Sequence, residues 1–386
     1  MKLYCDITLP ASKSESNRAL MITAYGGFAP VFQALSDSHD TKVLQEALCL
    51  AQKGEHAINI ADCGTAARFM TTYLACHKGD WFLTGTERMK QRPMVPLVKA
   101  LRNLGAEIQY VENNDGLPLH IKGKPLIGGE VSIDMSQSSQ FASSLLLAAP
   151  TWSKGLELEL LGELSSLPYL EMTLSMMRYF GAVIELRERM IKVFPKPYQP
   201  RSFTISSDWS AASYWYEMAA LSKECEVRLR GLGGPSTSSV TATLQGDAVI
   251  VDWMRLLGVG TIVENDTLVL RKLPYEKRPL VFDFSQHPDL YPTMAATCTG
   301  LGIEATFIGL DNLALKESDR VEAMRTELAK LGNKPLSFCA HNDHRVVMAL
   351  APLAMRFGPV SFDHPEMVEK SYPKFWEDVA FLPVER

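Results

Sequence analysis

The chain repeats one local pattern four times, and this repeat constrains its fold more than any other feature. In each copy, a helical pattern of apolar residues ends at a glycine and a strand pattern follows. The glycines are Gly105, Gly181, Gly258 and Gly332, which lie 76, 77 and 74 residues apart. Glycine just past a last helical turn is a capping signal, because it adopts the left-handed conformation without a steric penalty. The regular spacing therefore predicts tandem copies of one structural unit.

Residues that favour paired strands follow the first two glycines. The paired segments are 107–111 with 117–122, and 183–187 with 190–194. Only a short segment, interpreted as a turn, separates the members of each pair. Each copy is therefore expected to end in a β-hairpin.

The residues before the first glycine add two strands and two helices to the repeated unit. They are a strand at 57–60, a helix from Thr65, a strand at 81–84 and a helix from Pro93. The same order is predicted within 130–194 and 203–271, with a weaker version in the remaining residues. We therefore predict an α/β protein built from βαβαββ units, several of which assemble into larger domains.

Composition limits the kinds of partner that the protein can have. The chain has 386 residues and is 46% hydrophobic, which is enough for two or three domains with proper cores. Its formal net charge of −5 argues against non-specific binding to nucleic acid or to a membrane surface. The sequence has no signal-peptide pattern and no apolar run of membrane-spanning length. We expect a soluble, cytoplasmic protein.

The cysteines favour the same compartment. There are seven, an odd number, and no two have the Cys-x-x-Cys spacing, which is typical of reduced thiols in the cytosol. Cys339, His341 and His344 are close in sequence, but a turn followed by a helix start explains them better than a metal site does. We predict no metal and no organic cofactor.

Cations stand at several predicted helix starts, where acidic residues would be more favourable. Lys13, Arg18, Arg68 and Arg345 each follow small or capping residues and precede a helical apolar pattern. A helix N-terminus carries a partial positive charge, so a nearby cation forgoes roughly 0.3 to 1 kcal/mol that an acid would gain. Any one of them could be a solvated surface cation. Their recurrence beside serine, glycine and threonine instead predicts a site for phosphate or carboxylate groups.

Two other predicted helix starts carry unusual polar groups. Ser138, Ser139 and Gln140 precede an apolar helix at 142–149, and N-capping explains one serine but not all three residues. The segment 315–320 places two cations and two acids before a helix, which on its own is typical of a solvated helix start. Both segments become candidates for the same phosphate or carboxylate site because they accompany the cations described above.

Asp289 and Lys370 complete the set of candidates. Asp289 lies at a helix start, where the helix dipole favours its ionised form, and it is either an N-cap or a base. Lys370 follows Val368-Glu369 near the C-terminus and adds one more cation.

Two loops are expected to have structural rather than ligand-binding roles. The segment 231–235 is rich in glycine but has neither Rossmann nor Walker spacing, so we expect a turn. The proline-rich segment 194–200 is either a crossover between domains or an ordinary surface loop.

As a set, these motifs resemble those of the 5-enolpyruvylshikimate-3-phosphate (EPSP) synthase family. The resemblance runs in order along essentially the whole chain. The motifs that carry it lie at 10–18, 64–68, 88–93, 138–140, 316–320, 343–345 and Lys370. The chain departs from the common family pattern at Asp62, Cys63, Phe69 and Leu167.

The resemblance implies an architecture. It predicts two inside-out α/β barrel domains, each of three βαβαββ repeats, with the active site in the interdomain cleft. One domain would span 12–205, and the other 1–11 plus 206–386. It also implies a monomer that closes around its substrates.

The resemblance further implies two small-molecule substrates, shikimate-3-phosphate and phosphoenolpyruvate. The residues implied for shikimate-3-phosphate are Lys13, Ser14, Arg18, Ser138, Ser139, Gln140, Ser166, Asp289, Asn312 and Lys316. Those implied for phosphoenolpyruvate are Lys13, Gly64, Arg92, Gln140, Arg320, Arg345 and Lys370. Arginine suits such sites because its planar fork binds pairs of carboxylate or phosphate oxygens. Arg68 is expected to support the Gly64 loop.

The implied reaction needs a base, an acid and stabilisation of negative charge. Asp289 is the expected base toward the shikimate hydroxyl, and Glu317 is the expected proton donor to C3 of phosphoenolpyruvate. Lys13 is expected to stabilise charge at the reacting centre. Glu317 must be protonated to donate, yet Lys316 and Arg320 flank it and should lower its pKa in the empty enzyme.

Two alternatives remain. One is the related enolpyruvyl transferase that acts on a UDP-amino sugar, but that family carries a reactive cysteine on the loop matching 86–93, and this chain has none there. The other is a catalytically silent anion-binding relative, against which the presence of both Asp289 and Glu317 argues.

Overall fold

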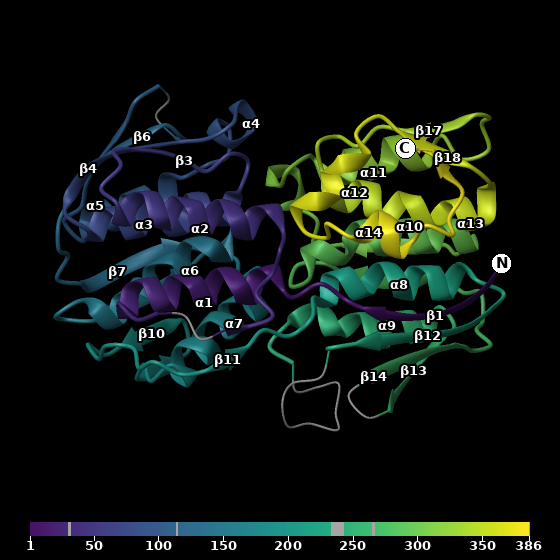
Figure 1. Ribbon diagram of the computed structural model, residues 1–386, viewed down its shortest axis with the longest axis horizontal. Coiled ribbons are helices and arrows are strands. Elements are labelled where there is room, and N and C mark those ends of the chain that lie inside the picture. Colours follow the sequence, from purple (N-terminus) through teal and green to yellow (C-terminus); the bar gives the residue numbers. More distant parts are fainter. Residues whose placement is uncertain (30–31, 113–114, 233–242, 265–266, 386) are drawn as a thin grey trace. The chain divides into compact units, whose positions relative to one another are not determined.

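The structure is a computed structural model that describes residues 1–29, 32–112, 115–232, 243–264 and 267–385. The chain divides into two compact units (Figure 1), which we call the first and the second unit. The first unit comprises Lys13–Leu35 and Asp40–Thr204. The second unit comprises Met1–Ser12, Ser36–His39 and Ile205–Arg386. Residues 233–235 of the predicted glycine-rich turn lie outside the described residues.

The first predicted repeat forms a four-stranded sheet in the first unit. Its elements are β3 (Ala57–Asn59), α3 (Gly64–Cys76), β4 (Gly79–Thr84), α4 (Glu87–Lys90), α5 (Val95–Asn103), β5 (Glu107–Tyr110) and β6 (Leu119–Gly123). The strand order is β3-β4-β6-β5, with β3 parallel to β4 and β6 antiparallel to both of its neighbours. The predicted hairpin is confirmed.

The second repeat has the same arrangement. Its elements are β7 (Gly129–Asp134), α6 (Ser139–Ala148), β8 (Leu156–Leu161), α7 (Leu167–Tyr179), β9 (Ile184–Arg187) and β10 (Met190–Val193). The order β7-β8-β10-β9 again places a parallel pair beside an antiparallel hairpin. The two sheets thus share one topology, as the glycine spacing predicts.

The third repeat, in the second unit, takes its first strand from the beginning of the chain. Its elements are β1 (Lys2–Thr8), α8 (Trp209–Leu221), β12 (Glu224–Arg230), α9 (Ile250–Leu256), β13 (Val259–Glu264) and β14 (Thr267–Lys272), in the order β1-β12-β14-β13. The prediction that this copy begins at Phe203 is wrong. Instead β11 (Phe203–Thr204) pairs with β2 (Phe32–Gln33) in the first unit. β1 forms the longer ladder, since all seven of its residues pair in parallel with β12.

The remaining elements confirm a weaker version of the pattern. They are α10 (Tyr291–Leu301), α11 (Arg320–Leu328), α12 (His344–Leu350), α13 (Ala354–Phe357), α14 (Phe375–Asp378) and the strands β15 (Leu280–Asp283), β16 (Ala305–Ile308), β17 (Leu336–Phe338), β18 (Val360–Phe362) and β19 (Val384–Glu385). β15 pairs with β16 in parallel, and β17, β18 and β19 form a second parallel sheet. No hairpin follows Gly332, because the short β17 pairs with β18 from beyond α12.

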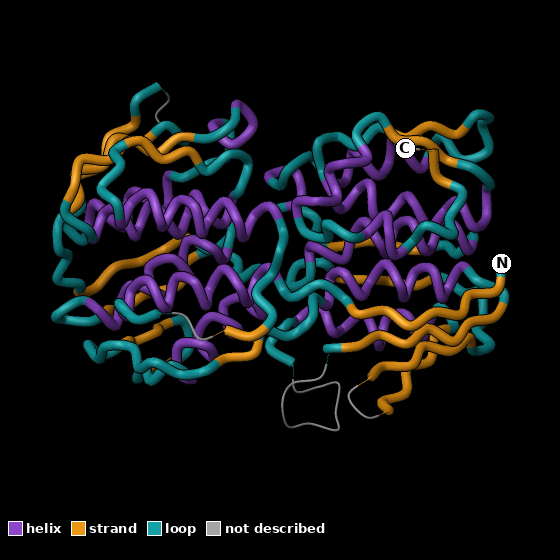
Figure 2. The backbone as a smooth tube through the Cα atoms, viewed as in Figure 1, coloured by secondary structure: helices purple, strands orange, loops and turns teal. Residues whose placement is uncertain are grey.

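Helices form much of the core of each unit, and the strands lie toward its outside (Figure 2). α6 in the first unit is buried except at Gln140, and α8 in the second is buried except at Ser210. By contrast, β7, β8 and β12 alternate between buried and more exposed positions. A helix that is apolar around most of its circumference must be covered on all sides. Its N-terminus is then the part that can meet a ligand.

Within the described residues, no helix is both long enough and apolar enough to cross a bilayer.

Candidate active site

The start of α1 (Lys13–Gly26) carries the first predicted cations. Lys13 Nζ lies 3.0 Å from Asp40 Oδ2, and the Lys13 side chain is 12% exposed. Arg18 is buried and donates to Thr173 Oγ1 at 2.7 Å, to the Ser14 carbonyl at 2.9 Å and to the Tyr169 carbonyl at 3.1 Å. Burial lowers the pKa of Arg18 to about 10, so it remains protonated at neutral pH. Arg18 therefore ties the start of α1 to the first turns of α7.

Gly64 opens α3 and is closely surrounded by two guanidinium groups. A Cβ atom at this position would lie 2.6 Å from Arg92 Nη1 and 2.9 Å from Arg68 Nη1. Arg68 Nη1 donates to the Gly64 carbonyl at 3.0 Å, which agrees with its predicted supporting role. Only glycine leaves room for both arginines beside the helix N-terminus. The arrangement concentrates positive charge where backbone N–H groups also point.

Cys63, one of the departures from the family pattern, caps this helix. Its Sγ accepts from Ala66 N at 3.3 Å and donates to the Asp40 carbonyl at 3.6 Å. Asp40 is the partner of Lys13, so the thiol links the Lys13 segment to the Gly64 segment. The side chain is fully buried.

The serine pair lies at the start of α6 as predicted. Ser138 Oγ accepts from Gln140 N at 3.2 Å, so this serine is the N-cap. Gln140 Nε2 donates to Thr65 Oγ1 at 3.2 Å, which joins the starts of α6 and α3. Ser139, at the first helical position, is buried. Capping thus accounts for Ser138, and the Gln140 side chain contacts a second helix start.

Ser166 precedes α7 with φ of 56° and ψ of 36°. A serine in this left-handed region is uncommon, and non-glycine residues held there often mark functional sites. Leu167 follows it as the first residue of α7, and Arg18 binds the carbonyl of Tyr169 in the same turn. The contacts of Arg18, Asp40 and Gln140 therefore join the N-termini of α1, α3, α6 and α7 within the first unit.

Arg320 is the centre of the predicted site in the second unit. Its Nε donates to Asp343 Oδ2 at 2.8 Å, Nη1 to Asp289 Oδ1 at 2.8 Å and Nη2 to Glu317 Oε2 at 2.9 Å. Arg345 Nη2 donates to the other Asp289 oxygen at 2.7 Å. Arg320 is 1% exposed and Arg345 is 6% exposed. Two buried arginines thus hold the predicted base, and one of them also holds the predicted acid.

Asp289 belongs to the 3-10 helix η4 (Pro288–Leu290) that precedes α10. Burial would raise its pKa, but Arg345, Arg320 and Lys316 together lower it well below its ordinary value. The carboxyl is therefore ionised at neutral pH. A carboxylate with so low a pKa is a weak proton acceptor, so a base would have to exchange its arginine contacts for the substrate hydroxyl.

The other second-unit candidates are also buried or partly buried. Asn312 is 5% exposed, and within the described part of the chain its Oδ1 has no hydrogen-bond partner. It can therefore accept from a ligand hydroxyl. Lys370 ends the 3-10 helix η7 (Pro365–Lys370) and is 5% exposed. Lys316 is partly exposed and lies close enough to Asp289 to lower its pKa.

Sequence reasoning missed two buried residues beside Asp289 and Arg345. Tyr214 in α8 is 1% exposed, and burial raises its pKa although Arg345 and Arg320 oppose this. Asp247 in the 3-10 helix η3 (Gly246–Val249) accepts from Ser210, and burial and the Asp289 charge raise its pKa to about 7. Tyr214 sits inside an apolar helix pattern and gives no signal, whereas Asp247 follows a glycine and could have been read as a helix start.

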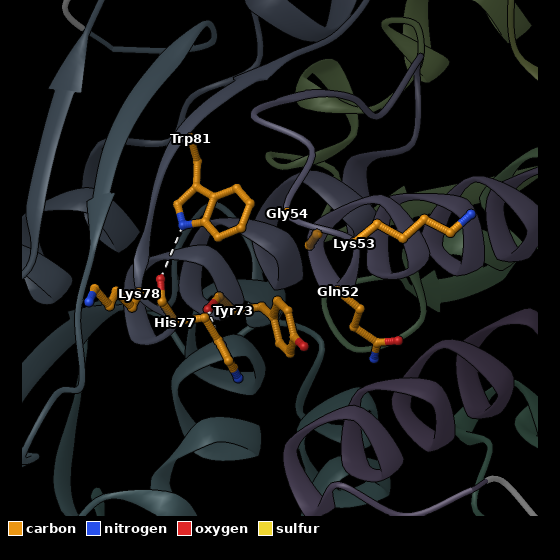
Figure 3. A pocket seen from close by; sticks show the side chains of 8 residues that line it. Gln52, Lys53, Gly54, Tyr73, His77, Lys78 and Trp81 are labelled. Carbon is orange, nitrogen blue, oxygen red and sulfur yellow. Dashed lines mark hydrogen bonds between the residues drawn. The ribbon is translucent and has the colours of Figure 1, made fainter.

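A hollow of about 430 Å³ lies in the first unit, where Tyr73, near the end of α3, and His77, just after it, are among the residues that line it (Figure 3). Lys53 and Lys78 extend from it in opposite directions, and the Trp81 indole donates to the His77 carbonyl. None of the predicted site residues is among those that line it.

The chain is similar to known proteins along most of its length. The profile of the family described as EPSP synthase (3-phosphoshikimate 1-carboxyvinyltransferase) matches residues 35–379. A 3-phosphoshikimate 1-carboxyvinyltransferase of Bacteroides fragilis is 42% identical and covers 98% of this chain and 95% of its own length. The corresponding protein of Haemophilus influenzae is 33% identical and covers 96% and 95%.

A solved structure gives the same result for the fold. EPSP synthase of Acinetobacter baumannii matches with a TM-score of 0.73 at 21% identity, covering 99% of this chain and 96% of that chain. The α/β fold prediction is confirmed at this level, and the family predicted from the motifs is confirmed by the profile and the relatives. The chain belongs to the EPSP synthase family.

Proposed function

We propose that this chain transfers the enolpyruvyl group of phosphoenolpyruvate to the 5-hydroxyl of shikimate-3-phosphate and releases inorganic phosphate. This is the step of the shikimate pathway that leads to chorismate and the aromatic amino acids. The observation that carries the proposal is the cluster in which Arg320 binds Asp289, Glu317 and Asp343 while Arg345 shares Asp289. This cluster combines anion-binding groups with the two acids that the chemistry requires.

The two compact units correspond to the two domains of the enzyme in this proposal. Domain limits of 12–205 and of 1–11 plus 206–386 are supported by the division of the chain near residues 12 and 204. Each domain is proposed to be an inside-out barrel of three copies of the βαβαββ unit, of which the last in the chain lacks its hairpin. Buried helices, strands with one more exposed face and the shared strand order support that description. The residues of both domains act on the same pair of substrates.

Shikimate-3-phosphate binds at the starts of α1, α6 and α7 in the first unit. Ser14, Arg18, Ser138, Ser139, Gln140 and Ser166 serve this substrate, together with Lys13 and the second-unit residues Asp289, Asn312 and Lys316. Serine hydroxyls and backbone N–H groups at helix starts hold phosphate well. Asn312 Oδ1, which has no hydrogen-bond partner among the described residues, is suited to a ring hydroxyl.

Phosphoenolpyruvate binds beside Gly64 and at the second-unit arginines. Lys13, Gly64, Arg92, Gln140, Arg320, Arg345 and Lys370 serve this substrate. The support is the pair of guanidinium groups packed against Gly64 and the burial of Arg320 and Arg345. Buried arginines cannot lose their protons, so they remain cationic next to the phosphate and the carboxylate.

The chemistry proceeds by addition and elimination. Asp289 removes the proton from the 5-hydroxyl, whose oxygen bonds to C2 of the enol while Glu317 protonates C3. The tetrahedral intermediate then loses phosphate from C2 and a proton from C3, which restores the double bond. Lys13 stabilises the negative charge that develops at the reacting centre. Asp289 begins in contact with Arg320 and Arg345, so substrate binding has to redirect one of these bonds.

The enzyme works as a cytoplasmic monomer without a metal or organic cofactor in this proposal. The substrates are its only partners, and nucleic acids and membranes are not among them. A net charge of −5 supports the last point.

Phosphate release in a full substrate matrix tests the proposal. The purified protein should release phosphate only when both substrates are present, and a UDP-amino sugar should not replace shikimate-3-phosphate. Release with phosphoenolpyruvate alone, or with the sugar nucleotide, would contradict the proposed substrate pair. No release under any condition would favour a silent anion-binding relative.

A further inference from the structure

The loop that leads into α12 contains two consecutive non-glycine residues in the left-handed region. His341 has φ of 52° and Asn342 has φ of 55°. A residue with a Cβ atom is disfavoured in this region, although asparagine tolerates it better than most. Two in succession need neighbouring contacts to hold them. Such over-determined turns commonly serve a site.

The turn is connected directly to the charged cluster. Asp343 follows it, and Asp343 N donates to the Ala340 carbonyl across the turn at 2.9 Å. The Asp343 carboxylate accepts from Arg345 N at 2.9 Å and from Arg320 Nε at 2.8 Å. The conformation of His341 and Asn342 therefore determines where Asp343 can meet the two arginines.

Glu327 holds the turn from α11. This carboxylate is 1% exposed, and its Oε2 accepts from Lys330 Nζ at 2.6 Å and from Cys339 N at 2.9 Å. Its Oε1 lies 2.8 Å from His341 Nε2. A buried carboxylate forms strong hydrogen bonds of this kind. Glu327 thus binds the backbone at Cys339, just after β17, and the side chain of the left-handed His341.

A second carboxylate fixes the other side of the turn. Asp363, just after β18, accepts from Ala340 N at 2.7 Å. That bond is to the backbone, so it does not depend on which side chain stands at 341. Among the contacts that Glu327 and Asp363 make with residues 339–341, the one between Glu327 and His341 is therefore the one that a substitution at 341 can remove selectively.

We propose that Glu327 and His341 are positioning residues for the reaction. The bond between them holds the left-handed turn that places Asp343, and Asp343 in turn fixes the backbone of Arg345 and the guanidinium of Arg320. Neither residue touches substrate. The inference rests on the proposed function, because it assigns Arg320 and Arg345 to phosphoenolpyruvate.

Two substitutions at His341 distinguish an effect of the bond to Glu327 from an effect of how well the residue at 341 adopts a positive φ. The amide nitrogen of glutamine can take nearly the place of His Nε2, whereas that of asparagine takes the place of Nδ1 and cannot reach Glu327. His341→Gln should keep the bond, and His341→Asn should lose it. Backbone preference alone ranks them the other way, because asparagine is the better residue for positive φ. The two explanations thus predict opposite orders.

Steady-state kinetics with each substrate varied in turn gives the readout. His341→Asn should raise the KM for phosphoenolpyruvate about tenfold, as expected for loss of one hydrogen bond to a charged group. The KM for shikimate-3-phosphate should change much less, and His341→Gln should resemble the unsubstituted protein. Equal KM values for phosphoenolpyruvate in all three proteins, or a larger increase in His341→Gln than in His341→Asn, would overturn the inference.

Glu188 provides a matched control in the first unit. It lies in the turn between β9 and β10 with φ of 49° and has an exposed side chain. Glu188→Gln and Glu188→Asn should leave both KM values unchanged. An equal rise in the KM for phosphoenolpyruvate at Glu188 would show that the effect is general and would also overturn the inference.

A third variant keeps the test decisive if His341→Asn folds poorly. Asn342→Gly relieves one left-handed residue without touching the contact between Glu327 and His341. The double variant His341→Asn/Asn342→Gly should recover the Tm but retain the raised KM for phosphoenolpyruvate. Recovery of both would mean that only stability was affected. If the unsubstituted protein had no activity, the proposed function itself would be contradicted. That result is distinct from every outcome that concerns only His341.

Discussion

Arg345 Nη2 lies 2.7 Å from Asp289 Oδ2 while Arg320 binds the other oxygen of the same carboxylate. The proposed base is thus held ionised by two cations that are also proposed to bind phosphoenolpyruvate. An anionic substrate that competes for these arginines would loosen their hold on Asp289 and raise its pKa toward a useful range. In the proposed mechanism, substrate binding and activation of the base are therefore coupled through Arg320 and Arg345.

Asp289→Asn should lower kcat by about 100-fold or more, because the amide cannot accept the hydroxyl proton. Stopped-time phosphate assays with both substrates at saturation measure this directly. The KM for shikimate-3-phosphate should change far less than kcat, since the amide keeps the shape of the side chain. A kcat within a few-fold of the unsubstituted value would remove Asp289 from the role of base.

The same substitution predicts a pH dependence of stability. The pKa of Asp289 is depressed in the folded protein, so its contribution is fully present above the unfolded value, about 3.9, and is lost as pH falls through the folded value. The Tm difference between the unsubstituted protein and Asp289→Asn should therefore be constant from pH 5 to 7 and shrink in more acidic buffer. A Tm difference that grows as the pH falls would contradict a depressed pKa of Asp289 in the folded protein.

Gly64→Ala should raise the KM for phosphoenolpyruvate. The added methyl group would lie 2.6 Å from Arg92 Nη1 and 2.9 Å from Arg68 Nη1, so at least one guanidinium must move. We expect an increase of about tenfold or more, comparable to the loss of one charged hydrogen bond. Kinetics with phosphoenolpyruvate varied at saturating shikimate-3-phosphate tests this, and an unchanged KM would show that the crowding is relieved without affecting the site.

Glu217→Met should stabilise the protein. Glu217 in α8 is fully buried, and within the described residues neither carboxylate oxygen has a hydrogen-bond partner. Replacing it by an apolar side chain of similar length removes an uncompensated polar group, with an expected gain of about 1–3 kcal/mol at pH 7. Urea unfolding of both proteins measures the difference, and kcat should remain within about twofold because no site contact changes.

The pH dependence of that gain provides a second check. Burial raises the pKa of Glu217 well above its ordinary value. The contribution of the glutamate is therefore best below the unfolded pKa of about 4.3 and deteriorates as pH rises toward the folded value. The advantage of Glu217→Met should be small near pH 4 and larger at pH 7. An advantage that is independent of pH would indicate that the carboxyl has an unnoticed partner.

Tyr214→Phe should raise the KM for phosphoenolpyruvate a few-fold, because it removes a buried hydroxyl beside Arg345. Tyr216 is the matched control. It is buried on the same helix, but its hydroxyl pairs with Thr261 Oγ1 at 2.9 Å. Tyr216→Phe should lower the Tm without changing either KM. Identical kinetics in the two variants would mean that the Tyr214 hydroxyl has no influence on Arg345.

Local features of the fold and site were predictable because they depend on neighbouring residues. Ser138, Asp319 and Asp343 cap α6, α11 and α12 with their side chains, and capping chemistry can be read from a few letters. The exchange of β1 for β11 could not be read in this way, since it depends on pairing between strands more than 200 residues apart. Local patterns do not specify which distant edge a strand joins.

Electrostatic partners inside the site were harder to predict. In the sequence, the motif at 343–345 indicates an anion site through its cation, Arg345. In the structure, the buried Asp343 carboxylate joins the Arg320 guanidinium to the backbone of Arg345. The resemblance implies that Arg18 holds substrate, and in the structure Arg18 donates to Thr173 and to two backbone carbonyls. A sequence pattern shows which residues carry charge. It does not show which charges meet in three dimensions.

We propose that cations from both units serve one reaction, and kcat/KM of two single variants tests this proposal. Lys13→Met removes a first-unit cation and Lys370→Met removes a second-unit cation, and both can be assayed by phosphate release with both substrates. Each variant should lose about 100-fold or more in kcat/KM, the scale expected when a group that stabilises developing charge is removed. If either variant had an unchanged Tm and a kcat/KM near that of the unsubstituted protein, the proposal that cations from both units serve one reaction would be contradicted.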